Sequence, residues 1–175
     1  MSLVACERDK KTAEAPVDKA AAPHTFNEEE KVRNTVILYT SFLAEGYRQQ
    51  NMNQLMQVAT EQRATKAYYH MAALGEGNVK MDSKLNEITF TNVKVIPPDK
   101  ADAETVEKWD YKYIDFKTGK EVHENSVTYV LGYHLVKISE KWYVDDITVV
   151  SAKEKKSEQY LPFTDRPGSE EKKHE

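Results

Sequence analysis

The feature that most constrains this chain is a change in the spacing of its apolar residues after Gly77. Before Gly77, apolar residues recur every three or four positions, which is typical of amphipathic helices. After it, apolar and polar residues alternate, which is typical of strands with one buried face. Helices followed by a series of strands predict an α+β domain, because each kind of element buries its apolar side against the other.

The N-terminal part of the domain contains signals for three helices. Asn27 precedes three glutamates, and this cap predicts a helix over 28–50. A short helix is expected around Leu55, and Thr60 is expected to cap a third helix over 61–74. The residues expected on the apolar sides of the two longer helices are Val32, Val36, Ile37, Tyr39, Leu43, Tyr47, Ala67, Tyr68, Met71 and Leu74.

The C-terminal part predicts a long antiparallel meander. In its first strand the alternation changes phase at Thr91-Asn92, which indicates a β-bulge or a bend. Pro97-Pro98 ends that strand, residues 117–120 and 139–141 have the composition of hairpin turns, and the last strand is expected over 142–150. The predicted fold class is α+β, with the N-terminal helices packed into a strongly curved antiparallel sheet.

The first six residues place the chain's single cysteine directly after a Leu3-Val4-Ala5 triplet. This arrangement resembles a bacterial lipobox, in which the chain is cut before the cysteine and the thiol is acylated, so lipidation of Cys6 is expected. A secretory signal needs a basic segment and about 7–15 apolar residues before its cleavage site, and here only Met1 and Ser2 precede the triplet. We therefore expect a lipoprotein truncated within its signal peptide. A chance match in a cytoplasmic protein and a vector-derived start are the alternatives.

The segment after Cys6 predicts a tether. Residues 7–25 contain no aromatic residue and a single branched aliphatic one, so they bury too little apolar surface to offset the entropy of ordering. We expect a lipobox-like start and disordered tether over 1–26, a folded domain over 27–150, and a charged, mostly extended tail over 151–175. The expected location is the cell envelope, with the domain lipid-anchored and facing the periplasm or the exterior.

Several functional classes find no support in the composition and the motifs. The net charge of −4 argues against a nucleic-acid-binding surface, which needs a concentration of basic residues. No apolar run is long enough to span a membrane, so the lipid on Cys6 is the expected membrane contact. His70, His123 and His134 have no metal-ligand spacing and no nucleophile motif is present, so no metal, cofactor or catalytic residue is assigned.

Aromatic residues are concentrated in the predicted strands. The candidate ligand-binding aromatics are Trp109, Tyr111, Tyr113, Tyr129 and Tyr133, with Tyr143 on the last strand. They would line the mouth of the curved sheet and stack on an apolar ligand, which their phenol groups would orient. The alternative is that they form the core, because strands favour aromatic residues and cross-strand aromatic pairs stabilise a curved sheet.

Residues 27–150 resemble the nuclear-transport-factor-2-like, or cystatin-like cone, superfamily, which includes SnoaL- and ketosteroid-isomerase-type domains. The resemblance is carried by residues 36–47 leading into 51–58, and by the alternating strand 129–137 followed by the tryptophan-led strand 141–147. It implies a cone or half-barrel. For the isomerase-like members it also implies a carboxylate that faces tyrosines inside the cone.

Asp145 and Asp146 are the candidate carboxylates of such a site. Adjacent residues of a strand point to opposite faces, so only one of the two can enter the cone, and Asp145 is included among the candidate ligand-binding residues. Neither residue matches the isomerase motif position by position. An exposed or turn-bonded aspartate is the alternative.

The sequence predicts a non-catalytic binding module of a membrane-anchored envelope lipoprotein, whose partner is a small apolar ligand or an envelope protein. One alternative is a small isomerase- or cyclase-like enzyme that uses a pocket carboxylate and tyrosines. Another is a scaffold that forms a homodimer through the outward residues Ile114, Val130 and Val136.

Overall fold

The structure is a computed structural model that describes residues 27–155 of the 175-residue chain. Its helical elements are α1 (Glu28–Gln49), the 3-10 helix η1 (Asn53–Gln57) and α2 (Glu61–Glu76). Its strands are β1 (Val79–Ile96), β2 (Lys100–Asp115), β3 (Glu121–Ile138) and β4 (Lys141–Lys155), so β4 continues beyond its expected end at Val150. The expected lipobox and tether, Cys6 included, lie outside the described residues.

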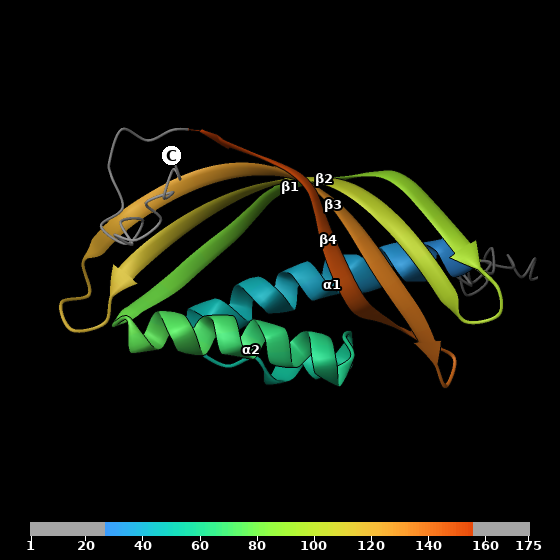
Figure 1. The fold of residues 1–175 in the computed structure, drawn as a ribbon, viewed down its shortest axis with the longest axis horizontal. Helices are drawn as coiled ribbons and strands as arrows, with labels where there is room; N and C mark the ends of the chain where they lie inside the picture. The colour runs from blue at the N-terminus through green and yellow to red at the C-terminus, as the bar shows by residue number, and fades with distance from the viewer. Residues whose placement is uncertain (1–26, 156–175) are drawn as a thin grey trace, which may run out of the picture.

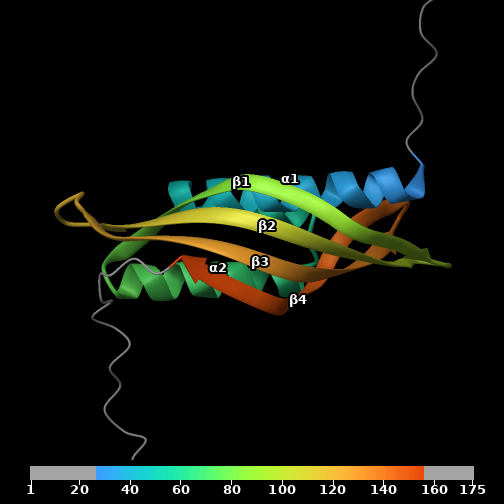
Figure 2. The same ribbon diagram turned by 90° about the horizontal axis from the view of Figure 1, so that it is seen from above.

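The four strands form one antiparallel sheet in the order β1-β2-β3-β4, in which each strand pairs with its sequence neighbours. Figure 1 shows this sheet arched over α1 and α2, which lie beneath its concave face. Seen from above in Figure 2, α1 follows the β1 side of the sheet and α2 lies toward the opposite side. The α+β class and the strongly curved sheet over N-terminal helices are confirmed, and the sheet stays open because β1 and β4 do not pair.

Register shifts let the long strands curve while their apolar residues stay on the concave face. In β1 the shifts lie between Leu85 and Glu87 and between Phe90 and Asn92. The second shift confirms the phase change predicted at Thr91-Asn92, whereas the first was not predicted. A bulge adds twist and bends the strand. Two further shifts in the β3–β4 pairing bend the other side of the sheet.

The start of α1 is fixed by its cap and by Glu28. Asn27 Oδ1 accepts from the Glu30 amide at 2.8 Å and Glu30 Oε2 accepts from the Asn27 amide at 2.9 Å, which is the predicted capping box. Glu28 also accepts from Trp142 Nε1 at 2.9 Å, so the helix start is tied to β4. The hydrogen bond from Lys31, followed by the bond from Trp142, lowers the pKa of Glu28 to about 2.

The core lies between the helices and the concave face of the sheet. Its fully buried apolar side chains include Val32, Val36, Tyr39, Leu55, Leu135 and Val144. Two residues predicted on the apolar helix sides are instead exposed, Ile37 at 41% and Tyr68 at 51%. The buried side of α2 is formed by Ala64, Ala67 and Met71, and Tyr68 lies outside it.

The edge of β4 is partly covered by the connection between η1 and α2. The Val144 amide donates to Val58 O at 2.8 Å, and the Thr60 amide donates to Val144 O at 2.9 Å. Such pairing removes part of the open edge that a sheet would otherwise present. It also fixes where α2 begins, because Thr60 is the N-cap of α2 and accepts from the Arg63 amide at 3.4 Å.

Gly46 of α1 packs directly against the chain that turns back after the helix. A Cβ at Gly46 would lie 2.5 Å from Met52 Sδ and 3.1 Å from Asn51 O. We expect Gly46→Ala to lower the free energy of unfolding by about 1–2 kcal/mol, because the Asn51 carbonyl must shift together with the buried end of Met52, which costs more than the gain in helix propensity returns. Urea unfolding followed by circular dichroism measures the change.

Gly75 of α2 provides the matched control. A Cβ there would have Phe116 Cε2 as its nearest neighbour, at 4.0 Å. Gly75→Ala should leave the free energy of unfolding unchanged or raise it by up to about 1 kcal/mol, since it adds helix propensity without a clash. Equal effects of the two substitutions would contradict the close packing at Gly46.

Candidate functional site

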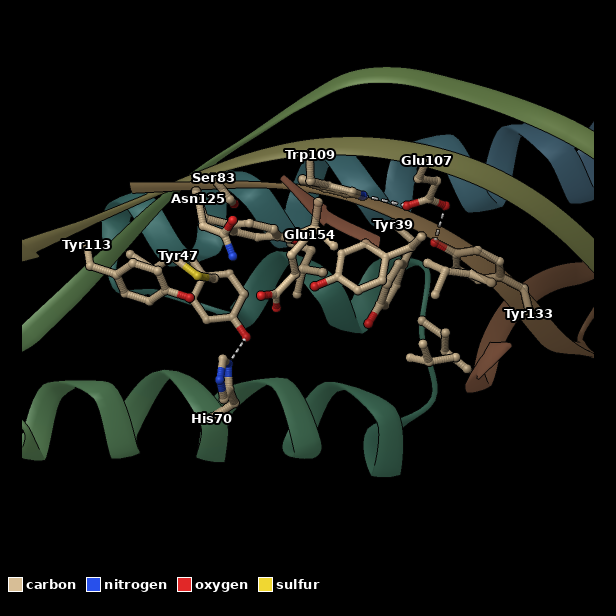
Figure 3. A pocket seen from close by; sticks show the side chains of 18 of the residues that line it. Tyr39, Tyr47, His70, Ser83, Glu107, Trp109, Tyr113, Asn125, Tyr133 and Glu154 are labelled. Atoms are coloured by element: carbon tan, nitrogen blue, oxygen red, sulfur yellow. Dashed lines mark hydrogen bonds between the residues drawn. The ribbon is translucent and has the colours of Figure 1, made fainter. Parts of the chain in front are cut away.

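A cavity of about 470 Å³ lies between the concave face of the sheet and the two helices. Its volume is within the range of about 300–1,000 Å³ that is usual for small-molecule sites. Helix α1 contributes Tyr39 and Tyr47, and α2 contributes Arg63 and His70. Figure 3 shows Tyr39, Tyr47 and His70 on the side of the cavity opposite Trp109 of the sheet.

The aromatic residues predicted to bind a ligand come together on that wall. Trp109, Tyr111, Tyr113, Tyr129 and Tyr133 all line the cavity. The rings of Trp109 and Tyr111 stack, with centroids 6.0 Å apart and planes at 14°, and Tyr129 meets Tyr111 edge-on at 6.5 Å. Trp109 and Tyr133 are also buried in the structure, so the wall and the core share these residues.

Neither candidate aspartate lines the cavity. Asp145 is the extra residue of a bulge in β4, because its neighbours Val144 and Asp146 pair with Leu135 and His134. Asp146 Oδ1 lies 3.0 Å from Lys66 Nζ, and this hydrogen bond lowers the pKa of Asp146.

Tyr143 is also absent from the cavity wall. It is adjacent to the buried Trp142 on β4, so its side chain points to the convex face of the sheet. There the Lys141 ammonium lies 5.4 Å from the centroid of the Tyr143 ring. The aromatic wall therefore comes from β2 and β3, not from the last strand.

The polar centre of the cavity is Glu107, which the sequence patterns did not indicate. Its side chain is 0% exposed. Glu107 Oε1 accepts from Thr105 Oγ1 at 2.8 Å and from the Tyr133 hydroxyl at 2.7 Å, and Oε2 accepts from Trp109 Nε1 at 2.7 Å. Figure 3 shows the bonds from Trp109 and Tyr133. These donors offset the cost of burying a carboxylate.

The alternation of side chains along a strand could have identified Glu107. The residue stands two positions before Trp109 on β2, so the two side chains share one face of the strand. Burial, followed by the charge of Glu107, raises the pKa of Tyr133 well above its ordinary value. The Tyr133 phenol is therefore a neutral donor to the carboxylate.

Arg63 is held at the cavity by Tyr39. Arg63 Nε donates to the Tyr39 hydroxyl at 2.7 Å, and its guanidinium carbon lies 5.6 Å from the centroid of the Tyr39 ring. Tyr39 is fully buried and packs edge-on against Tyr133 at 6.2 Å. Burial raises the pKa of Tyr39, so its phenol stays neutral. A contact chain therefore joins Arg63 to Glu107 through two tyrosines.

Tyr47 and His70 form a second polar contact across the cavity, from α1 to α2. The Tyr47 hydroxyl lies 2.5 Å from His70 Nδ1, and the two rings meet edge-on at 5.5 Å. Burial lowers the pKa of His70 and raises that of Tyr47. Both groups are therefore favoured in their neutral forms, in which the phenol donates to the imidazole nitrogen.

The other histidines lie apart from this contact. The His123 ring packs against Tyr113 at 5.7 Å, and His134 Nδ1 lies 2.8 Å from Asp102 Oδ1. Over residues 27–155, no three His, Cys, Asp or Glu side chains gather into a group that would hold a metal ion. In the same part of the chain, no helix has the length and apolar character needed to cross a bilayer.

Comparison with known proteins shows the fold. No family model matches the sequence, and no curated protein matches it. The intermembrane-space region of the chloroplast protein ARC6 is similar in structure, with a TM-score of 0.63 and 13% identity over 71% of this chain and 98% of that one. A Xanthomonas campestris structure described as a calcium/calmodulin dependent protein kinase II association domain gives a TM-score of 0.43 and 18% identity, over 78% of this chain and 96% of that one.

At such identities the likeness concerns the fold alone. The described domain has helices followed by an open, curved antiparallel sheet, as the resemblance to the nuclear-transport-factor-2-like superfamily implies. Membership of that superfamily stays a prediction.

Substitutions at Glu107 test whether its carboxylate holds the wall together. Glu107→Leu leaves three buried donors without an acceptor, so we expect the free energy of unfolding to fall by about 2–4 kcal/mol. Glu107→Gln should cost only about 1 kcal/mol, because its amide oxygen still accepts from Trp109 and the two hydroxyls can rotate. Urea unfolding followed by tryptophan fluorescence measures both values.

The control is Glu104→Leu, which changes an exposed carboxylate on the convex face of the same strand. It should change the free energy of unfolding by less than about 0.5 kcal/mol. A loss as large as that of Glu107→Leu would show that the buried hydrogen bonds are not the cause.

Proposed function

We propose that this chain is a non-catalytic module that binds a small, mainly apolar ligand in the cavity beneath its sheet. The observation that carries the proposal is the aromatic wall of β2 and β3, which borders a cavity of about 470 Å³. Apolar and aromatic walls with a few placed polar groups are typical of small-molecule sites. A ligand seated there would gain about 25 cal/mol for each Å² of apolar surface removed from water.

Proton-transfer catalysis is the second candidate, because Glu107 places a carboxylate beside phenols in the cavity. A general base needs an oxygen within hydrogen-bond reach of the proton that it removes. Both Glu107 oxygens already accept from protein donors. This arrangement favours a structural role for the carboxylate, and hence binding over catalysis.

A homodimeric scaffold is a further alternative. Ile114, Val130 and Val136 are half-buried and belong to the convex face, where they leave some apolar surface in reach of a second copy. Sedimentation of the purified domain at micromolar concentration separates a monomer from a dimer. A monomeric domain would rule out the homodimeric scaffold and would leave the proposal of ligand binding in the cavity unaffected.

The proposed setting is the cell envelope, through a lipid on Cys6. The Leu3-Val4-Ala5-Cys6 start supports it, and so does the position of the domain, which begins at the Asn27 cap and leaves residues 7–26 between the cysteine and the fold. The ARC6 region of similar fold is described as lying in an intermembrane space, which is also an envelope compartment.

Nile red, a neutral dye that fluoresces in apolar surroundings, tests the cavity. We expect saturable binding of one dye per protein. Leu131 lines the cavity, so Leu131→Trp should fill it and weaken binding at least about tenfold, or about 1.4 kcal/mol. Fluorescence titration measures the dissociation constants.

The neighbouring Val130 faces the convex side, so Val130→Trp is the matched control and should leave dye binding unchanged. Equal dye binding by wild type and Leu131→Trp, or no saturable binding at all, would contradict the proposed site.

Metabolic labelling with an alkyne analogue of palmitate tests the anchor. The full-length gene product, expressed in a bacterial host with its own upstream coding sequence, should carry the label and fractionate with membranes. Cys6→Ser should lose the label and move to the soluble fraction, because two or more acyl chains are what holds a protein on a bilayer. An unlabelled, soluble wild-type protein would refute the lipid anchor and leave the cavity proposal standing.

A further inference from the structure

We infer that the ligand is an amphipathic acid, whose carboxylate binds Arg63 and whose elongated apolar body lies along the aromatic wall. The inference rests on the proposed function and adds the chemical class of the ligand. Its basis is the distribution of charge around the cavity and the way in which Arg63 is held.

Arg63 is the one Lys or Arg side chain in the described lining of the cavity. Within residues 27–155, its side chain is hydrogen-bonded through Nε to the Tyr39 hydroxyl, at 2.7 Å. This bond leaves the two terminal guanidinium nitrogens, and a terminal nitrogen pair is one of the edges with which arginine binds a carboxylate. Tyr39 is fully buried, so the orientation of the guanidinium is fixed before a ligand arrives.

The surroundings of Arg63 carry charges of both signs. Arg63 lies in the first turn of α2, just after the Thr60 cap, where the helix dipole favours an anion. Two carboxylates oppose this effect: Glu61 stands in the same turn, and Asp146 interacts with Arg63, although Asp146 is hydrogen-bonded to Lys66 at 3.0 Å. Burial lowers the pKa of His70, so the other basic residue of the lining stays neutral.

Neither of the two carboxylates that line the cavity is placed to pair with Arg63. Both oxygens of Glu107 already accept hydrogen bonds from protein donors. Glu154 is exposed, and it pairs in register with Val127 of β3. Tyr133, whose ring contacts Tyr39 next to Arg63, is six positions further along β3. At about 3.3 Å per residue these positions are about 20 Å apart along the strand. The Glu154 charge acts on Tyr113, so Glu154 lies toward the Tyr113 side of the cavity.

The same spacing gives the shape of the ligand. Lining residues of β3 extend from Asn125 to Tyr133, a contour of about 26 Å at about 3.3 Å per residue. Between them lie Val127, Tyr129 and Leu131, which offer apolar surface without a charge. An apolar chain or extended ring system follows this wall, with its acid group at the Arg63 end.

cis-Parinaric acid, a fluorescent long-chain polyene acid, and its methyl ester test the inference together with Nile red. In wild-type protein the acid should bind at least about tenfold more tightly than the ester, since only the acid pairs with the guanidinium. Arg63→Gln should lower the affinity for the acid to that for the ester, and it should leave the affinities for the ester and for Nile red unchanged. Arg63→Lys keeps the positive charge but lacks the paired nitrogens of the guanidinium, so it should retain part of the preference for the acid over the ester.

Arg48→Gln is the matched control, because Arg48 pairs with Glu45 and Asp82 and does not line the cavity. It should bind all three probes like wild type. The comparison of acid with ester in wild-type protein does not depend on the folding of any variant.

The outcomes separate the two proposals. Equal binding of acid and ester by wild-type protein, or an unchanged acid affinity in Arg63→Gln, overturns the acid class, while bound Nile red keeps the cavity as a ligand site. If none of the three probes binds wild-type protein, both proposals fail.

Discussion

The whole structure depends on how one sheet face is covered. Four strands of 15–18 residues expose a long apolar face, and α1 and α2 are the helices that cover it. A flat sheet of this length would leave much of that face in water. The bulges bend the strands so that the face wraps around the helices. The cavity remains between this curved face and the helices.

Glu107 stabilises the wall of that cavity at a cost in desolvation. A buried carboxylate is tolerated only where donors compensate it, and here the donors are side chains of the wall itself. Trp109 and Tyr133 therefore have fixed orientations, and Tyr133 in turn packs on Tyr39. A wall that is already ordered loses little further entropy when it binds a ligand, which is the general advantage of preorganisation.

Residues with strong local preferences made the fold predictable. The Asn27 cap marks the start of α1, and the phase change at Thr91 locates a bulge. The site was only partly predictable, because parity along a strand holds only between bulges. The aromatic residues of β2 and β3 lie on unbroken stretches and come together as expected, whereas the bulge at Asp145 shifts the parity of β4. Glu107 was missed because a charged residue is assigned to solvent unless its three donors are already known.

The position of Arg63 could not have been read from the sequence, because it depends on a contact between distant segments. The backbone of Val144 on β4 pairs with Val58 and Thr60, and this pairing fixes where α2 begins. The first turn of α2 then reaches the cavity, and Tyr39 from α1 orients the guanidinium. Helix α1, helix α2 and the sheet therefore meet at Arg63. The placement of one cation at the end of an apolar wall follows from closing the core, so the same contacts that stabilise the fold also set the charge that a ligand meets.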